Sequence, residues 1–212
     1  MATNLYNTRD YETVINACNA ARSVKYMLGV TADTGMGKTT ALQAYALRPN
    51  VFYYYLDSTV TPSIFLKDML RIMGVKFEGT LNAMLNKIAD ELNTLAAPLV
   101  ILDECGKMSA RMMLLVHSMR DRTINNAGFV LAGMPDFKNS LIRCVERGKT
   151  GYGEFHRRIN VWSELEGLSV EEINTVLADN GITDKNEQRE FRKYRRFGDL
   201  MNEIKLYKLV GS

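Results

Sequence analysis

The chain has 212 residues, of which 46% are hydrophobic and 24% are charged, with a formal net charge of +3. A chain of this size and composition can bury one good core and add a small appendage. No apolar run approaches the roughly 20 residues that span a bilayer, and the N-terminus lacks the basic-then-apolar pattern of a signal peptide, so we expect a cytoplasmic protein with no membrane partner. The three cysteines and two histidines have no metal-ligand spacing, which favours reduced thiols over disulfides or a zinc site.

The first predicted elements are a helix over residues 8–22 and a strand over residues 25–31. In the helix, Tyr11, Val14, Ile15 and Cys18 recur at helical spacing. The strand leads directly into a glycine-rich loop, and the loop opens a helical pattern over residues 40–47. This order of strand, loop and helix is the context that a phosphate-binding loop requires.

The loop reads Ala32-Asp33-Thr34-Gly35-Met36-Gly37-Lys38-Thr39. Gly35 and Gly37 allow the backbone to turn its N–H groups inward at the positive end of a helix, where they can bind polyphosphate. Lys38 is placed to reach the β- and γ-phosphates of ATP, and Thr39 to offer its hydroxyl to Mg²⁺. The predicted cofactor-binding residues are Asp33, Thr34, Gly35, Met36, Gly37, Lys38, Thr39 and Thr40.

A chance Gly-Lys-Thr sequence in a turn is the alternative interpretation of this motif. Gly148-Lys149-Thr150 is such a sequence, because Arg143 stands where the opening Gly or Ala belongs and no apolar strand leads into it. The context therefore favours the first loop as the functional one.

The next stretch predicts a second strand and two helices. Residues 51–56 form a β-rich apolar run that is typical of a parallel strand covered on both faces. Thr61 and Pro62 read as the N-cap and first residue of a helix that ends near Gly74, and another helix begins at Thr80.

Residues 99–102 predict a third strand, which delivers Asp103 and Glu104 to its end. A parallel strand beside the loop strand would place Asp103 at the carboxyl edge of the sheet, where it can hold Mg²⁺ through water while Glu104 polarises the attacking water. A buried strand that happens to end in acids is the alternative, but the phosphate loop upstream favours the catalytic interpretation. Thr39 and Asp103 are the predicted metal residues.

The rest of the sheet is predicted from three further helix and strand patterns. A methionine-rich helix over residues 109–119 suits core packing, and a strand over 128–132 and a helix over 135–146 follow. Residues 147–153 are glycine-rich and predicted as a mobile segment that leads, through residues 155–158, to a strand over 159–162. Alternating strands and helices predict an α/β fold, with a parallel sheet between two layers of helices.

From residue 167 the pattern contains helices only. Ser169 and Glu172 form a capping box ahead of a helix with an apolar stripe, and later helices are predicted near residues 185–196 and 199–209. We therefore predict two domains: a nucleotide-binding core with its N-terminal helix over residues 1–166, and a small helical lid over residues 167–212.

These motifs in this order resemble the AAA+ ATPases, and the likeness covers nearly the whole chain. More narrowly, the loop, the Asp103-Glu104 pair, the turn at residues 132–135 and the segment Arg157-Arg158-Ile159 look like the transposition regulators typified by the phage Mu B protein and TnsC. The resemblance implies an AAA+ P-loop fold with a five-stranded sheet in the order 5-1-4-3-2. It also implies ATP bound between neighbouring subunits of a filament or ring on double-stranded DNA, which delivers target DNA to a transposase.

The resemblance also implies roles for single residues. Lys38, Asp103 and Glu104 match the phosphate-loop lysine, the magnesium aspartate and the water-activating glutamate. An arginine finger, given across the subunit interface to the γ-phosphate, is expected just before the last strand, where Arg157 and Arg158 are the candidates and Arg143 and Arg147 stand behind them. The implied catalytic residues are Glu104, Asp103, Lys38, Arg157 and Arg158.

Two positions depart from the pattern of the family. Met134 stands where a polar sensor is usual, and residues 198–202 of the lid lack the second sensor arginine. Both departures favour slow hydrolysis that depends on DNA or a partner.

The sheet begins near residue 25, so we expect DNA contacts to come from the ATPase core. The resemblance points to Lys76, Thr80 and Lys87 as contacts to phosphates without base reading, the alternative being three solvent-facing polar residues.

Four functions remain in competition. The leading hypothesis is a DNA-binding regulator of transposition, and the nearest rival is an AAA+ helicase loader or protein-remodelling ATPase. A small-molecule P-loop kinase is disfavoured by the Asp-Glu pair and the helical C-terminal segment. A nucleotide-bound scaffold that hydrolyses nothing is the fourth.

Overall fold

The computed structural model describes residues 5–210, without the side chain of Val210. Its centre is one parallel sheet of five strands in the order β2-β3-β4-β1-β5. This is the predicted 5-1-4-3-2 order, so the predicted α/β fold is confirmed. The strands are β1 (Met27–Thr31), β2 (Val51–Tyr55), β3 (Leu99–Asp103), β4 (Gly128–Gly133) and β5 (Ile159–Glu164).

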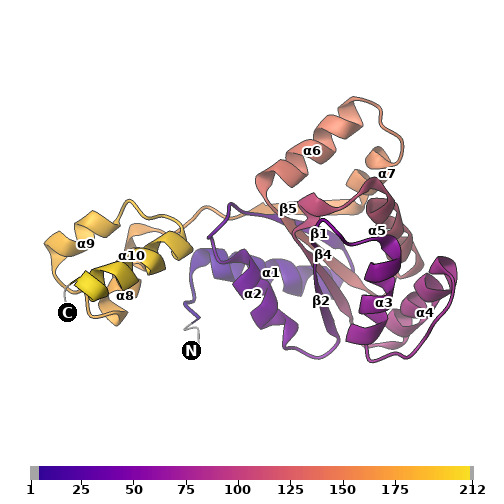
Figure 1. Cartoon of the computed structure of the whole chain (residues 1–212), viewed down its shortest axis with the longest axis horizontal. Helices are drawn as coiled ribbons and strands as arrows, with labels where there is room; N and C mark the ends of the chain where they lie inside the picture. The colour runs from indigo at the N-terminus through magenta and orange to yellow at the C-terminus, as the bar shows by residue number, and fades with distance from the viewer. Residues whose placement is uncertain (1–4, 211–212) are drawn as a thin grey trace.

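Helices cover both faces of the sheet (Figure 1). On one face lie α1 (Arg9–Val24) and α2 (Lys38–Ala46), and on the other α3 (Pro62–Ile72), α4 (Leu81–Thr94) and α5 (Ala110–Arg122). A 3-10 turn, η1 (Cys105–Lys107), follows β3, while α6 (Pro135–Glu146) and α7 (Tyr152–Arg158) connect β4 to β5. The helices therefore bury both faces of the sheet. Loops remain at two edges, the amino edge where the strands begin and the carboxyl edge where they end.

Alternating side chains of the strands form two separate cores. In β3, Val100 and Leu102 pack with α3, α4 and α5, whereas Leu99 and Ile101 pack with α1 and α2. Such a two-sided apolar strand is what a parallel sheet between helices demands, because neither face meets water. Each fully buried side chain of this size contributes about 1.5–3 kcal/mol.

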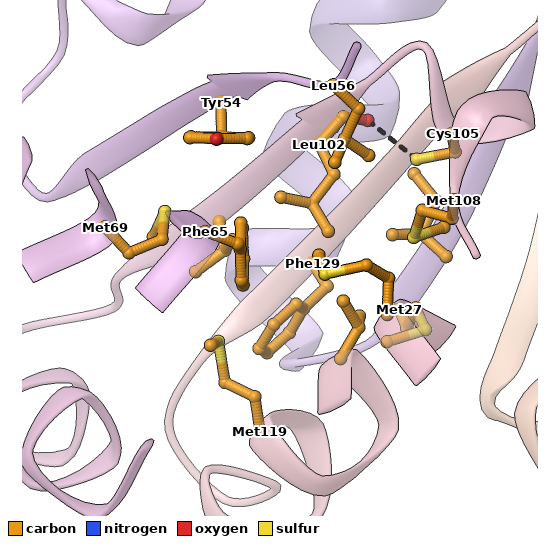
Figure 2. Close-up of a cluster of buried hydrophobic side chains, with 14 of the residues drawn as sticks. Met27, Tyr54, Leu56, Phe65, Met69, Leu102, Cys105, Met108, Met119 and Phe129 are labelled. Atoms are coloured by element: carbon orange, nitrogen blue, oxygen red, sulfur yellow. Dashed lines mark hydrogen bonds between the residues drawn. The ribbon is translucent and has the colours of Figure 1, made fainter. Parts of the chain in front are cut away.

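The larger core is rich in sulfur, as Figure 2 shows around Phe129. Met119 of α5 and Met69 of α3 reach into it, and both are fully buried. The predicted packing role of the methionine-rich helix is thus confirmed. Cys105 donates its Sγ–H to the carbonyl of Leu102 at 3.1 Å, and burial raises the pKa of this thiol. All three cysteines are free thiols, as predicted.

Helix α7 was not predicted, since the sequence analysis assigned its residues to a loop and a lead-in to the strand. Gly151 precedes the helix with φ of 85°, a left-handed conformation that glycine adopts without strain. Phe155 anchors the helix in the larger core with 1% exposure. One buried aromatic therefore outweighs the poor helix propensity of Gly153.

The C-terminal helices α8 (Val170–Asp179), α9 (Lys185–Phe191) and α10 (Phe197–Val210) pack around an apolar cluster of their own. Figure 1 shows them beside the sheet layers, joined to them through the segment after β5. The buried carboxylate of Asp10, in α1, accepts hydrogen bonds from the backbone N–H groups of Glu166 (3.0 Å) and Gly167 (2.9 Å). The chain is thus fixed to α1 at the point where we place the domain boundary, which stays a prediction.

The capping box predicted for α8 is present: Ser169 and Glu172 exchange hydrogen bonds between side chain and backbone. Among the described residues, no helix is long and apolar enough to cross a membrane.

Candidate active site

The loop between β1 and α2 has the backbone that the motif requires. Gly35 and Gly37 have φ of 85° and 87°, in the left-handed region. A Cβ added at Gly37 would meet nothing within 4 Å, so conformation, and not space, calls for glycine there. The first turn of α2 then points its N–H groups at a pocket of about 200 Å³ that the loop lines together with Glu104 and Met134. A recess of backbone N–H groups at a helix N-terminus fits the phosphates of a nucleotide.

Lys38 and Thr39 both contact Asp103 at the end of β3. The Nζ of Lys38 lies 2.6 Å from Oδ1 of Asp103, and the hydroxyl of Thr39 donates to Oδ2 at 2.7 Å. Asp103 is fully buried and Lys38 is 6% exposed, so each charge depends on the other for compensation. Strand β4 lies between β1 and β3, so the expected side-by-side placement of these two strands is wrong. The residues still meet, because the carboxyl ends of all strands share one edge.

Glu104 holds a strained backbone at the end of β3, with φ of 59°. Its N–H donates to Oδ1 of Asp103 at 2.8 Å, and its carboxylate lies 3.4 Å from Lys38 and 3.9 Å from Lys107. A left-handed conformation costs a residue other than glycine about 1–2 kcal/mol. The turn into η1 thereby directs the Glu104 side chain to the pocket instead of continuing the strand.

Tyr53 of β2 is part of the site, and the sequence analysis missed it. Its hydroxyl donates to Oδ2 of Asp103 at 3.1 Å, and burial together with the nearby negative charge raises the pKa of this phenol. Residues 51–56 read as an apolar strand, so the sequence alone gives no sign of this contact. Only the register of β2 on β3, which places Tyr55 opposite Asp103, could have indicated it.

Thr39 and Asp103 offer two adjacent oxygen atoms. This suits Mg²⁺, an ion that takes one or two protein ligands beside phosphates and water.

A second recess, mostly apolar, adjoins the phosphate loop. Tyr6, Tyr11, Met36 and Phe197 line it together with residues of α2, and the rings of Tyr6 and Phe197 lie 5.6 Å apart. A mostly apolar recess beside a phosphate site suits a nucleotide base. Of these four residues, the sequence analysis assigned only Met36 to the site. It missed the others because Tyr6 precedes α1, Tyr11 lies in α1 and Phe197 begins α10.

Helix α10 also contacts the phosphate loop directly. The N–H of Gly198 donates to the carbonyl of Gly35 at 2.7 Å, and Arg196 pairs with Asp33 at 3.0 Å. A Cβ at Gly198 would lie 3.2 Å from that carbonyl oxygen, so glycine allows the close approach. The segment 198–202, which lacks the arginine of the family pattern, therefore contacts the phosphate loop through the backbone of Gly198.

A family model described as "AAA domain" matches residues 21–141, more than half of the chain and including the phosphate loop and the Asp103-Glu104 pair. The chain belongs to the AAA family. Its members are P-loop ATPases, which agrees with the geometry above.

Solved structures share this AAA+ fold at low sequence identity. The replication initiator DnaA, bound to AMPPCP and single-stranded DNA, is 17% identical with a TM-score of 0.63, over 99% of this chain and 64% of that one. The Aeropyrum pernix ORC2 protein, in ADPNP and ADP complexes, is 18% identical with a TM-score of 0.57. The match covers 87% of this chain and 54% of that one. The Walker-type ATPase of Pyrococcus abyssi is 13% identical with a TM-score of 0.57, over 90% and 64%. The chain thus spans 54% to 64% of the lengths of these proteins. No curated protein sequence matches it.

The finger candidates of this AAA chain lie at the opposite edge of the sheet from the phosphate loop. Arg158 forms two hydrogen bonds with Asp121, at 2.7 and 3.1 Å, which lower the pKa of that carboxylate. The sequence analysis did not foresee this partner. Arg157 is exposed, and among the residues described it forms no ion pair. Of the two, Arg157 is the one available to a neighbouring molecule. Behind them, Arg143 pairs with Asp136.

The three predicted DNA contacts have different surroundings in the AAA domain. Thr80 caps α4 by accepting the N–H of Ala83 at 3.2 Å, and Lys87 pairs with Glu91 at 2.6 Å, which raises the pKa of the lysine. Lys76 is exposed and lines a groove with Lys67, Arg71 and Phe77. Of the three, Lys76 alone belongs to a basic surface groove.

Proposed function

We propose that this AAA protein is an ATP-dependent regulator that assembles on double-stranded DNA and directs the target-site choice and activation of a transposase. The cluster of Lys38, Thr39 and Asp103, with Glu104 beside it, is the observation that carries the ATPase part. The transposition part rests on the resemblance at residues 132–135 and 157–159.

In this proposal the chain's own residues divide the work on ATP. Bound ATP with Mg²⁺ would supply the phosphoryl group that water accepts. Lys38 would bind its phosphates, Thr39 and Asp103 would hold the metal, and Glu104 would take a proton from the water as its oxygen bonds to the γ-phosphorus and ADP leaves. Tyr53 keeps Asp103 oriented, as partners behind a metal ligand do. Met134 offers no polar atom to the transition state, which supports slow turnover.

DNA binding is supported by the exposed Lys67 and Lys76 of the groove and by the single-stranded DNA that the DnaA structure holds. Contacts to phosphates alone release counterions, so affinity falls steeply as salt rises and depends little on sequence. The proposal places Lys67 beside Lys76 as a contact and gives Arg71, Thr80 and Lys87 smaller parts, because Arg71 pairs with Asp68, Thr80 caps α4 and Lys87 pairs with Glu91.

Electron microscopy with a non-hydrolysable ATP analogue, with and without duplex DNA, tests the proposal. Filaments or rings encircling DNA are expected with the analogue and not without it, and Lys38→Ala should form none. Rings that form on a protein client and leave DNA free would point to a helicase loader or remodelling ATPase instead.

The same preparation gives the salt test by fluorescence anisotropy with duplexes of unrelated sequence. Similar affinities that fall together from low to physiological salt are expected. A strong preference for one duplex, or binding that ignores salt, contradicts phosphate-only contacts.

A further inference from the structure

Basic side chains gather on one side of α9 and on the turn that joins it to α10. They are Lys185, Arg189, Arg192, Lys193 and Arg195, all of which are exposed, and we call them the α9 basic surface. Lys185, Arg189 and Arg192 follow one another at intervals of four and three residues, so they form one stripe along the helix. Figure 1 shows α9 at the end of the molecule away from the sheet.

The carboxylates that alternate with these cations in the sequence are engaged elsewhere. Asp184 caps α9 by accepting the N–H groups of Asn186 and Glu187 at 2.8 and 3.1 Å. Glu187 accepts a hydrogen bond from the hydroxyl of Tyr207 in α10, which raises the pKa of this phenol, and the charge of Glu190 raises it further. The two glutamates thus lie toward α10, and the helix separates them from the basic stripe.

The α9 basic surface therefore carries positive charge that the chain does not balance. Among the residues that the structure describes, none of its cations forms an ion pair. Arg189 has one long hydrogen bond, of 3.5 Å, to Asn186. Arg196, the next cation along the chain, pairs with Asp33 and is not part of the surface. The guanidinium groups of the surface can thus bind an anion without first losing a carboxylate partner.

The chemistry of this surface fits phosphate groups better than a protein partner. Between residues 185 and 196, all of which the structure describes, no large apolar side chain is exposed, whereas the centre of a protein interface is rich in such side chains. A guanidinium presents parallel N–H donors that match two oxygen atoms of a phosphate.

The one half-buried ring of the turn is not free to stack on a base. The ammonium of Lys193 lies over the ring of Tyr194, 5.0 Å from its centroid, and the ring of Phe191 packs beside it at 6.3 Å. Recognition of unpaired bases needs an open aromatic face. The surface therefore suits the phosphate backbone of a duplex more than the bases of a single strand.

We propose that the α9 basic surface is a second contact to double-stranded DNA, made to the phosphates alone. The inference rests on the proposed DNA binding and adds a surface to it. Helix α3, which lines the groove around Lys76, lies at the opposite end of the molecule from α9 in Figure 1, so the two contacts are separate. Their contributions to the free energy of DNA binding should therefore add.

Arg189→Gln combined with Arg192→Gln tests the inference, because it removes two charges of the stripe and keeps long polar side chains. Lys149→Gln combined with Lys205→Gln is the matched control, which removes the same charge at exposed positions outside the surface. Lys205 is two residues from Tyr207, so it lies on the side of α10 away from α9. ATP affinity without DNA should be the same in the wild type and in both variants.

Fluorescence anisotropy with a short labelled duplex and an ATP analogue, over a series of salt concentrations, gives the result. The slope of log affinity against log salt should be shallower by about 1.8 in the α9 variant, because each lost phosphate contact removes about 0.9 from it. Affinity at physiological salt should fall at least tenfold, and the control should match the wild type. An α9 variant that matches the control overturns the inference and leaves the proposed DNA binding intact. A wild type that binds no duplex overturns both.

A poly-glutamate peptide of the same charge as the duplex is the second probe. The wild type should bind the duplex at least tenfold more tightly than the peptide. Tighter binding of the peptide that is lost in the α9 variant would identify an acidic protein as the partner and overturn the inference.

Acetylation of lysines by acetic anhydride locates the contact in the wild type. The duplex should protect Lys193 and leave Lys205 as reactive as in the free protein. Equal reactivity of Lys193 with and without bound duplex also overturns the inference.

Discussion

Asp103 is shared by three side chains that come from distant parts of the chain. Lys38 and Thr39 reach it from α2, and Tyr53 reaches it from β2. Both oxygens of the carboxylate thus have fixed partners. Removal of one partner should move the carboxylate, and the direction of the movement depends on which oxygen loses its hydrogen bond.

At this scale we predict that Lys38→Ala abolishes ATP binding, whereas Glu104→Gln keeps binding and blocks turnover. Alanine removes the positive charge of the phosphate site and leaves Asp103 buried without its cation, but glutamine keeps the size of Glu104 and loses only its basicity. Binding is measured with a fluorescent ATP analogue and turnover by phosphate release. Lys149→Ala, in the second Gly-Lys-Thr sequence, is the control and should behave like the wild type. Equal ATP affinity of Lys38→Ala and wild type refutes the loop assignment.

Tyr53→Phe should weaken the affinity for Mg²⁺ in the presence of nucleotide by about tenfold. This is the lower scale for the loss of a partner behind a metal ligand. The phenol donates to the oxygen of Asp103 that also accepts from Thr39, so its loss loosens one proposed metal ligand. Tyr54→Phe, whose hydroxyl contacts Asp68 at 3.0 Å, is the matched control on the same strand. A Mg²⁺ titration that is unchanged in Tyr53→Phe would remove Tyr53 from the site.

Among the elements, α10 is held to the phosphate loop by the backbone bond of Gly198. We predict that Gly198→Ala speeds release of a fluorescent nucleotide about fivefold, equivalent to one lost hydrogen bond of ~1 kcal/mol, because the methyl group separates α10 from Gly35. Alanine also favours helix, so the lid itself should not lose stability. Gly153→Ala in α7, where a Cβ meets nothing within 4 Å, should leave release unchanged. Unaltered release in Gly198→Ala would mean that the lid does not retain nucleotide.

The elements also show how far sequence patterns reach. The phosphate loop and the Asp103-Glu104 pair followed from local patterns, because strand, glycine and charge signals are contiguous there, whereas the strand order followed from the resemblance alone. Tyr53 and three aromatic residues of the apolar recess, Tyr6, Tyr11 and Phe197, were missed, since their roles depend on register between strands and on the placement of α10. Helix α7 was missed because its glycines outweigh, in any local pattern, the single buried Phe155 that holds it.

At the scale of the whole molecule, Arg157 can reach a nucleotide only on another copy of the chain, since the phosphate loop of its own chain lies at the far edge of the sheet. We predict that Arg157→Ala leaves ATP binding by the monomer nearly intact and lowers DNA-stimulated hydrolysis by about 10³-fold, the lower scale of finger effects. Arg158→Ala should have a smaller effect, because Arg158 is held by Asp121 within the chain.

Mixing inactive proteins separates action between copies from a local effect. Arg157→Ala and Lys38→Ala subunits should together regain part of the hydrolysis, because an intact loop on one meets an intact arginine on the other. If no mixture recovers activity while both assemble, Arg157 does not act between copies.

The bonds between α1 and the start of the lid give the first helix a mechanical task. Asp10 holds the backbone at residues 166 and 167, and the N–H of Arg9 donates to Glu172 at the start of α8 at 2.6 Å. The second attachment, at Gly35, is a single backbone bond and a half-exposed ion pair. We therefore predict that the C-terminal helices, when they move, swing about their attachment to α1 and separate first from the phosphate loop.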